Sequence, residues 1–349
     1  MTEVLKGGNP YGSHRVIEPE GVLPQPALKL DNNMDRIWDN EILVDVEILN
    51  VDSASFTQIK EQAGGDDEEI KQIILSTVSQ RGKQQNPVTG SGGMFIGTVA
   101  RIGDKLEGRD LKPGDRIVSL VSLSLTPLRI DRIIQVKKDI DQVFIKGQAI
   151  LFESGVYAKM PDDIPAPLAL AALDVAGAPA QTARLVKKGD TVVIIGVTGK
   201  SGILCAYEAR KKIGPEGRII GIGHSQKKID RLRPLELCDE IVSLDATDAL
   251  RCYKTVSDLT GGKMADLVIN CVNIPNTEMA SILMCRDSGT VYFFSMATSF
   301  TKAALGAEGV GKNATMIIGN GYAKGHAELT LNILRESKPI RELYQRLYC

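Results

Sequence analysis

Apolar residues in the first part of the chain alternate with polar ones over short runs. One run begins at Ile42, Val44 and Val46, and turns rich in glycine or proline separate it from later runs. A spacing of two is typical of β-strands that bury one face. We therefore expect residues up to about 160 to form a mostly β domain without a long helix. The acidic stretch 64–72 is expected to be a surface loop or the start of a helix.

Beyond a proline-rich segment at 161–167, near-continuous apolar strands alternate with helical stretches. The strands are predicted at 191–195, 218–222, 240–244, 265–270, 289–294 and 315–319. Strands that are apolar on both faces are typical of a parallel sheet covered by helices. The expected fold class is α/β, a Rossmann-type doubly wound parallel sheet plus the mostly β domain. The expected domains are residues 1–165, residues 166–322, and a C-terminal helix in 323–349 that returns to the first domain.

A glycine turn follows the strand at 191–195 and opens an amphipathic helix. Its three glycines allow a sharp turn, a close approach to an anion, and packing of helix on strand. The helix N-terminus adds free N–H groups and a positive dipole end, so we expect a dinucleotide pyrophosphate here. An ordinary glycine-rich turn is the alternative. The expected cofactor-binding residues in and beside this turn are Gly196, Thr198, Gly199, Lys200, Ser201, Gly202 and Asn270.

The residues after the second strand of this sheet bear on the choice between NAD and NADP. NAD binding usually places an Asp or Glu there to hold the ribose 2′-OH. This chain instead has His224, Ser225, Lys227 and Lys228 and no acid. A hydroxyl and lysines suit a 2′-phosphate, so we expect use of NADP or NAD with NADP preferred, and we expect His224, Ser225 and Lys228 to contact it. A solvated helix start is the alternative for the lysines.

Composition and charge exclude several classes of function. The 349 residues suit two domains, and a net charge of -1 argues against a nucleic-acid partner. No apolar run has membrane-spanning length and no signal peptide is evident, so we expect no membrane partner and a cytoplasmic location. All six cysteines lie at or beyond Cys205, and His14 is the only histidine of the first domain. We therefore expect reduced thiols and no bound metal.

Several motifs of the chain resemble the medium-chain dehydrogenase/reductase superfamily over nearly its whole length. They are Gly97–Gly103, Lys112–Arg116, Lys188–Asp190 and the glycine turn. The resemblance implies a GroES-like substrate domain, a Rossmann domain, an active site in the cleft between them, and a homo-oligomer, either a dimer or a tetramer. The zinc ligands of the alcohol dehydrogenase branch are absent, because Asp52-Ser53 and Ser91-Gly92-Gly93 stand in their places.

A narrower resemblance points to the family of L-erythro-3,5-diaminohexanoate dehydrogenases of lysine fermentation. The stretches that carry it are Asn86–Met94, Asn270–Asn273, Phe293–Phe300, Gly306–Gly311 and Gly319–Tyr322. The resemblance implies that a diamino acid is the substrate and that its 3-amino group is removed by oxidative deamination. The products would be 5-amino-3-oxohexanoate, ammonia and the reduced cofactor. It also implies NAD as the usual acceptor, which disagrees with the lysines after the second strand.

Only a neutral amine can expel hydride, so the substrate ammonium must lose a proton, and without zinc a side chain or a chain of water molecules must handle it. We expect Asp52, beside Ser53, to accept the ammonium proton and later to activate water. Ser91 is expected to hydrogen-bond the substrate, and Glu278 to pair with the distal ammonium. The structural alternatives are a turn-forming Asp52, a loop around Ser91 that only needs its glycines, and a first-turn helix acid at Glu278.

Other polar residues are candidates for substrate binding. His14, Arg15 and Arg129 could hold the carboxylate, with a structural or surface role as the alternative for each. Asn273, Ser295 and Thr298 follow the fourth and fifth strands of the parallel sheet, on the side where ligands bind. Two further functions remain open, a zinc-independent NADPH quinone or enoyl reductase and a non-enzymatic nucleotide-sensing protein. Polar and acidic residues in the expected cleft favour the amine dehydrogenase.

Overall fold

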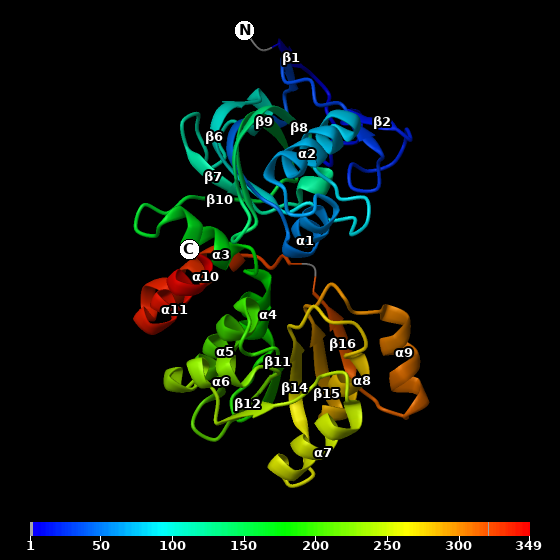
Figure 1. The fold of residues 1–349 in the computed structure, drawn as a ribbon, viewed down its shortest axis with the longest axis vertical. Coiled ribbons are helices and arrows are strands. Elements are labelled where there is room, and N and C mark those ends of the chain that lie inside the picture. Colours follow the sequence, from blue (N-terminus) through cyan, green and yellow to red (C-terminus); the bar gives the residue numbers. More distant parts are fainter. Residues whose placement is uncertain (1–2, 320) are drawn as a thin grey trace. The chain divides into compact units, whose positions relative to one another are not determined.

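The computed structural model describes residues 3–319 and 321–349. Its contacts divide the chain into two compact units, unit 1 (residues 1–170) and unit 2 (residues 171–349), and the division falls inside helix α3 (Ala166–Leu173). Unit 1 is mostly antiparallel β and unit 2 is a parallel α/β sheet (Figure 1), so the predicted fold class is confirmed. Asn320, within one of the stretches that carry the family resemblance, lies outside the described residues.

The main sheet of unit 1 has six antiparallel strands in the order β10-β7-β6-β5-β9-β8. They are β5 (Glu41–Asn50), β6 (Met94–Ile102), β7 (Arg116–Ser119), β8 (Leu128–Lys137), β9 (Gln142–Phe152) and β10 (Tyr157–Lys159). Two smaller pairs join β1 (Glu3–Leu5) to β4 (Arg36–Trp38) and β2 (Val16–Glu18) to β3 (Lys29–Leu30). Short 3-10 helices lie at Ser13–Arg15, Asp104–Leu106 and Leu123–Leu125.

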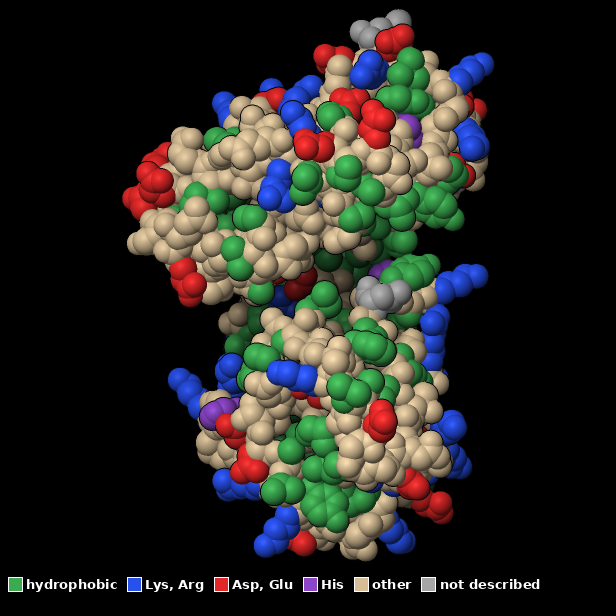
Figure 2. All heavy atoms as spheres, turned by 90° about the vertical axis from the view of Figure 1, so that its right-hand side faces the viewer, with side chains coloured by type: hydrophobic (Ala, Val, Ile, Leu, Met, Phe, Trp, Pro, Cys, Tyr) green, Lys and Arg blue, Asp and Glu red, His purple; other side chains and the backbone are tan. Residues whose placement is uncertain are grey.

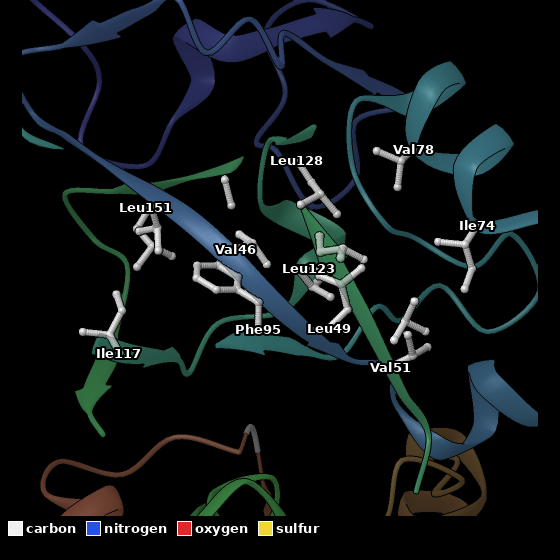
Figure 3. Close-up of a cluster of buried hydrophobic side chains, with 14 of the residues drawn as sticks. Val46, Leu49, Val51, Ile74, Val78, Phe95, Ile117, Leu123, Leu128 and Leu151 are labelled. Atoms are coloured by element: carbon white, nitrogen blue, oxygen red, sulfur yellow. The ribbon is translucent and has the colours of Figure 1, made fainter. Parts of the chain in front are cut away.

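Ile42, Val44 and Val46 of β5 face the core of unit 1, as their spacing predicts, and after a register shift between Val46 and Ile48 the next core position falls on Leu49. Val46 and Leu49 of β5 lie beside Phe95 and Leu128 in one interior (Figure 3), and all four are buried. Helices α1 (Ser53–Gln62) and α2 (Asp67–Arg81) close this core. Burial of alternate positions therefore fixes which face of β5 turns inward.

The expectation that unit 1 lacks a long helix is wrong, because α2 has 15 residues. The side chain of Asp66 accepts the backbone N–H groups of Glu68 and Glu69, which caps the helix at its start. Ile70, Ile74 and further apolar residues at a spacing of four are buried on one face. The acidic character of the stretch therefore reflects a helix N-terminus rather than a loop.

Unit 2 is built on six parallel strands in the order β13-β12-β11-β14-β15-β16. They are β11 (Thr191–Ile195), β12 (Arg218–Gly223), β13 (Glu240–Ser243), β14 (Ala265–Asn270), β15 (Cys285–Phe293) and β16 (Thr315–Ile318). The helices between and beside them are α4 (Gly177–Leu185), α5 (Lys200–Ile213), α6 (Gln226–Leu232), α7 (Ala249–Thr260), α8 (Glu278–Met284) and α9 (Phe300–Gly309), with a 3-10 turn at Arg233–Leu235.

The chain ends in two helices, α10 (His326–Glu336) and α11 (Lys338–Tyr348), rather than one. They belong to unit 2, where α10 packs against α4 and α5. The expected return of this segment to the first domain stays a prediction. Both helices are amphipathic, and Leu334 and Leu343 are among their buried residues.

Charged side chains of both signs intermingle on the face of the molecule drawn in Figure 2. No described helix combines the length and the apolar character needed to cross a membrane.

Candidate functional site

The glycine turn of unit 2 has the geometry of a dinucleotide loop. Gly196 has a φ of +80°, and a Cβ atom there would lie 2.6 Å from Cγ1 of Val272. A Cβ atom on Gly202 would lie 2.2 Å from the carbonyl oxygen of Gly196. The first helical hydrogen bond runs from the N–H of Ile203 to the carbonyl of Gly199. The earlier N–H groups of α5 have no intrahelical acceptor, so this end of the helix offers donors to a phosphate.

The turn lies where the strand order of the parallel sheet reverses, between β11 and β14. Ligands of such sheets bind at the carboxyl ends of the strands at this point. The loops that follow β14 and β15 leave the same edge of the sheet, because neighbouring strands run parallel. Unit 2 therefore brings the glycine turn together with the segments that hold Asn273, Ser295 and Thr298.

Asn270, expected to bind the cofactor, instead supports the loop after β14. It is fully buried, and its amide donates to Thr277 Oγ1 at 2.9 Å and to Ser281 Oγ at 3.0 Å. Its side-chain oxygen accepts the N–H of Val272 at 3.2 Å. These bonds commit the amide group of Asn270 to the loop, and its contact with a cofactor stays a prediction.

Lys200, expected beside the phosphates of the cofactor, forms an ion pair within the protein. Its Nζ lies 3.0 Å from Oδ2 of Asp174 and 5.3 Å from the centre of the Tyr348 ring. The ammonium thus pairs with an acid that the sequence analysis did not consider. The neighbouring side chains of Thr198 and Ser201 are buried, at 9% and 6% exposure, so the backbone of the turn is what it presents to a ligand.

The end of β12 carries the residues predicted to select the cofactor. His224, Lys227 and Lys228 are exposed and Ser225 is half-buried. Neither Lys227 nor Lys228 forms an ion pair with a described residue, so both ammonium groups are available to an anion. Asp245 is the nearby acid, after β13. Hydrogen bonds from the N–H and hydroxyl of Thr247, together with the charge of His224, lower the pKa of Asp245.

Glu278, expected to pair with the distal ammonium of the substrate, is a buried side chain with a backbone partner in the structure. Its side chain is 2% exposed, and Oε1 accepts the N–H of Ser299 at 2.7 Å. It therefore joins the start of α8 to the start of α9. Between these elements, Ser295 Oγ accepts the N–H of Ala297, and Thr298 Oγ1 is buried without a partner among the described residues. Asn273 is exposed.

In unit 1, Asp52 caps the N-terminus of α1 directly after β5. Its Oδ1 accepts the N–H of Ser55 at 3.0 Å, while Oδ2 is buried and has no hydrogen-bond partner in the described part of the chain. Ser53 Oγ donates to Asp141 Oδ2 at 2.8 Å. One carboxylate oxygen of Asp52 thus has the structural role that was the alternative for this residue. The other oxygen can still accept a proton or a hydrogen bond.

The loop that contains Ser91 packs against this junction. Ser55 Oγ and Thr89 Oγ1 are 2.5 Å apart, and Thr89 Oγ1 accepts the N–H of Ser91 at 3.3 Å. Gly93 has a φ of +95°, and a Cβ atom there would lie 2.8 Å from the backbone N of Asp52. The structure therefore groups Asp52, Ser53 and Ser91 at one corner of unit 1. The glycine at position 93 allows the backbone of this loop to lie close to the backbone of Asp52.

His14 and Arg15 are not available to a substrate carboxylate. Arg15 is fully buried, and its guanidinium donates to both carboxylate oxygens of Glu41 at 2.9 and 2.7 Å. His14 Nε2 lies 2.8 Å from Glu41 Oε1, and its Nδ1 accepts the N–H of Asn9. Burial alone would raise the pKa of Glu41, but the hydrogen bonds from His14 and Arg15 and the Arg15 charge lower it overall. Both residues therefore hold the N-terminal segment around the short helix Ser13–Arg15 against Glu41 of β5.

Arg129 lies on β8, where it donates to Gln148 Oε1 at 2.7 Å and to Asp131 Oδ1 at 3.2 Å. It lines a surface groove of about 560 Å³ whose walls also include Asp45 and Glu47. Neither Asp52 nor Ser91 borders this groove. The structure therefore does not join Arg129 to the Asp52 corner.

Within residues 3–319 and 321–349, no three His, Cys, Asp or Glu side chains are grouped as metal ligands. The six cysteines are free thiols, and burial raises the pKa of Cys238 to about 12 and of Cys252 and Cys285 to about 11. Buried neutral thiols are poor nucleophiles.

Four residues with a part in these arrangements were missed from the sequence, namely Thr89, Asp141, Asp174 and Tyr344. Only Thr89, within the unusual stretch 86–94, had a local signal. The other three act through partners far away in the sequence: Asp141 bonds Ser53, Asp174 pairs with Lys200, and the Tyr344 hydroxyl donates to the carbonyl of Lys200.

Comparisons with known proteins are consistent over the length of the chain. A family model described as the L-erythro-3,5-diaminohexanoate dehydrogenase N-terminal domain matches residues 14–161. The L-erythro-3,5-diaminohexanoate dehydrogenase of Acetoanaerobium sticklandii is 61% identical over 342 residues, which cover 98% of this chain and 99% of the relative. The enzyme of the same name from Fusobacterium nucleatum is 59% identical over 345 residues, covering 99% of this chain and 100% of the relative.

A solved alcohol dehydrogenase from Thermotoga maritima shares the fold. Its TM-score is 0.54 at 18% identity, and the match covers 88% of this chain and 84% of that one. At this identity the likeness concerns the fold alone.

Proposed function

The chain belongs to the L-erythro-3,5-diaminohexanoate dehydrogenase family, and we propose that it is an NAD(P)-dependent amine dehydrogenase that deaminates L-erythro-3,5-diaminohexanoate oxidatively. The observation that carries the proposal is about 60% identity to two enzymes of that name over nearly the whole chain. The glycine turn at the start of α5 supports it, because its backbone fits a dinucleotide. Membership in the medium-chain dehydrogenase/reductase superfamily is part of the proposal and is supported by motifs and fold.

The reaction must convert a C3 ammonium into a ketone. A bound nicotinamide supplies the acceptor for the C3 hydride. The substrate ammonium first loses a proton to give the neutral amine, and the amine then gives up its C3 hydride to that acceptor and becomes a C3 iminium. Water adds to the iminium, and ammonia leaves to give 5-amino-3-oxohexanoate. In sum, the substrate ammonium, one water and the oxidised cofactor give the ketone, an ammonium ion, the reduced cofactor and one proton.

Asp52 is the proposed acid–base residue for these proton transfers. Its Oδ1 is held by the N–H of Ser55, which fixes the carboxylate, and its Oδ2 has no partner within the described residues. A fixed carboxylate with one uncommitted oxygen is suited to take a proton from an ammonium and later one from water. Ser91, positioned by Thr89, is the proposed hydrogen-bonding partner of the substrate.

The proposed cofactor preference is NADP over NAD, with both used. Its support is the exposed pair Lys227 and Lys228 and the absence of an acid directly after β12. A homo-oligomer, either a dimer or a tetramer, is also proposed, and light scattering that gives the mass of one chain at working concentration would overturn it.

The experiment for the proposed activity measures formation of reduced nicotinamide from L-erythro-3,5-diaminohexanoate, with NAD and NADP in separate reactions, and release of ammonia in parallel. Equal amounts of reduced cofactor and ammonia are expected. Lysine is the matched control, because it has no amino group at C3. Protein that binds cofactor without turning over the diamino acid would contradict the proposal. In that case, oxidation of NADPH by a quinone or an enoyl compound would identify a reductase. Cofactor binding without any turnover would identify a nucleotide-sensing protein.

A further inference from the structure

The C-terminal helices contact the proposed dinucleotide helix α5 at two places. Near the C-terminal half of α5, Glu336 of α10 accepts the Tyr207 hydroxyl at 3.1 Å and the Lys211 ammonium at 2.7 Å. At the first residue of α5, the hydroxyl of Tyr344 from α11 donates to the carbonyl oxygen of Lys200. The C-terminal helices thus contact α5 at its first residue as well as in its C-terminal half.

Tyr344 is built into the interior as a hydrogen-bond donor. Its side chain is fully buried, and burial raises its pKa well above the usual value, so the phenol keeps its proton. Its ring packs edge-on against Tyr348, at 5.0 Å between ring centres. Tyr348 in turn lies beneath the Lys200 ammonium, which pairs with Asp174. These contacts fix the direction of the hydroxyl toward Lys200.

The bond acts on a peptide group that also faces the proposed cofactor. The carbonyl of Lys200 and the N–H of Ser201 belong to one peptide unit, which is planar, so fixing the direction of the carbonyl fixes the direction of the N–H. The Ser201 N–H precedes the first helical hydrogen bond, donated by Ile203, and has no intrahelical acceptor. A hydrogen bond to the carbonyl also polarises the peptide and strengthens its N–H as a donor.

We propose that Tyr344 is a positioning residue for cofactor binding, which orients the Lys200–Ser201 peptide so that the Ser201 N–H meets the pyrophosphate. The inference rests on the proposed function, since it assumes that a dinucleotide binds at the glycine turn. It assigns to the C-terminal helix a part in cofactor affinity, with no contact of its own to the cofactor. The sequence offered no sign of this, because Tyr344 is 144 positions away from Lys200.

The test compares full-length wild type with Tyr344→Phe, which removes only the hydroxyl. Tyr253→Phe is the matched control, because Tyr253 is an exposed residue of α7 in the same unit. We measure the Kd of NADH and of NADPH by fluorescence, and kcat and KM in the deamination assay. In Tyr344→Phe, the cofactor Kd and KM are expected to rise between about twofold and tenfold, the range for loss of one hydrogen bond. The kcat value and the KM of the diamino acid are expected to stay unchanged, as are all values of Tyr253→Phe.

A purely structural role would lower the melting temperature of Tyr344→Phe and leave the Kd of the folded protein unchanged, and that result overturns the inference. If Tyr344→Phe does not fold, replacing Tyr344 by 4-aminophenylalanine provides a weaker donor of the same shape. A higher cofactor Kd then supports the inference, and a wild-type Kd overturns it. Failure of wild type to bind either dinucleotide would instead contradict the proposed function.

Discussion

The Asp52→Asn variant separates the two jobs that the structure gives to this side chain. Oδ1 of Asp52 caps α1 by accepting the Ser55 N–H at 3.0 Å, and Oδ2, which has no partner among the described residues, is the proposed proton acceptor. An asparagine oxygen can take the place of Oδ1 and keep the cap, because Asn and Asp are equally good N-caps. The amide cannot accept a proton as the carboxylate does. Fold and chemistry are therefore affected differently by one substitution.

The expected sizes follow from those two roles. Loss of a general acid–base group lowers the rate by about 10²- to 10⁴-fold, which corresponds to about 3–5 kcal/mol of barrier. With the cap retained, we expect the free energy of unfolding to change by no more than about 1 kcal/mol. The large effect should appear in kcat across the pH range, with the cofactor Kd unchanged.

The assay follows reduced nicotinamide over a pH series, with chemical denaturation of the same samples. Asp66→Asn is the matched control, since Asp66 caps α2 through Glu68 and Glu69 in the same way and has no proposed role in chemistry. It should retain wild-type kcat. Normal turnover of Asp52→Asn at every pH would refute the assignment of Asp52 as the acid–base group. An equal loss in both variants would mean that removal of a negative charge at a helix N-terminus, rather than proton transfer, explains the effect.

Four further predictions concern the cofactor turn, its selectivity, the buried ion pair and the metal. Gly202→Ala would put a Cβ atom 2.2 Å from the Gly196 carbonyl oxygen, so cofactor binding should be lost in a fluorescence titration, and an unchanged Kd would show that the turn is not the binding loop. Lys228→Glu should raise the Kd of NADPH by about tenfold through charge repulsion and leave that of NADH within about twofold; equal effects on both would remove the 2′-phosphate from the argument. Arg15→Met leaves the Glu41 carboxylate buried without its main partner, and denaturant titration should show a loss of about 3–5 kcal/mol. Because the folded pKa of Glu41 is lowered, its stabilising contribution is present above the unfolded pKa and lost as pH falls through the folded pKa, so the difference between wild type and Arg15→Met should shrink in acid, and a constant difference would contradict this sign. Elemental analysis should find well under one zinc per chain, and activity that disappears with a chelator and returns with zinc would overturn the metal-free proposal.

The sequence by itself determined the features that depend on neighbouring residues. The apolar run 191–195 and the glycines after it encode a strand, a tight turn and a helix start within a dozen or so positions, and the structure forms all three there. The alternation from Ile42 likewise fixed the buried face of β5. Helix α2 was encoded in the same local way, by the Asp66 cap and the spacing of Ile70 and Ile74, although its acidic residues left a surface loop and a helix start both open.

Only the tertiary structure decided which polar groups are available for chemistry. A charged side chain has the same sequence signal whether it faces a ligand or a buried counter-ion, and the partner is set by chain segments that folding brings together. The guanidinium of Arg15 is paired with Glu41, which lies 26 residues away in the sequence. The ammonium of Lys200 is paired with Asp174. Asp52 keeps one carboxylate oxygen uncommitted because the Oδ1 cap orients it into a buried corner. The placement of the C-terminal helices on α5 was decided in the same way, by partners far apart in the sequence such as Lys211 and Glu336.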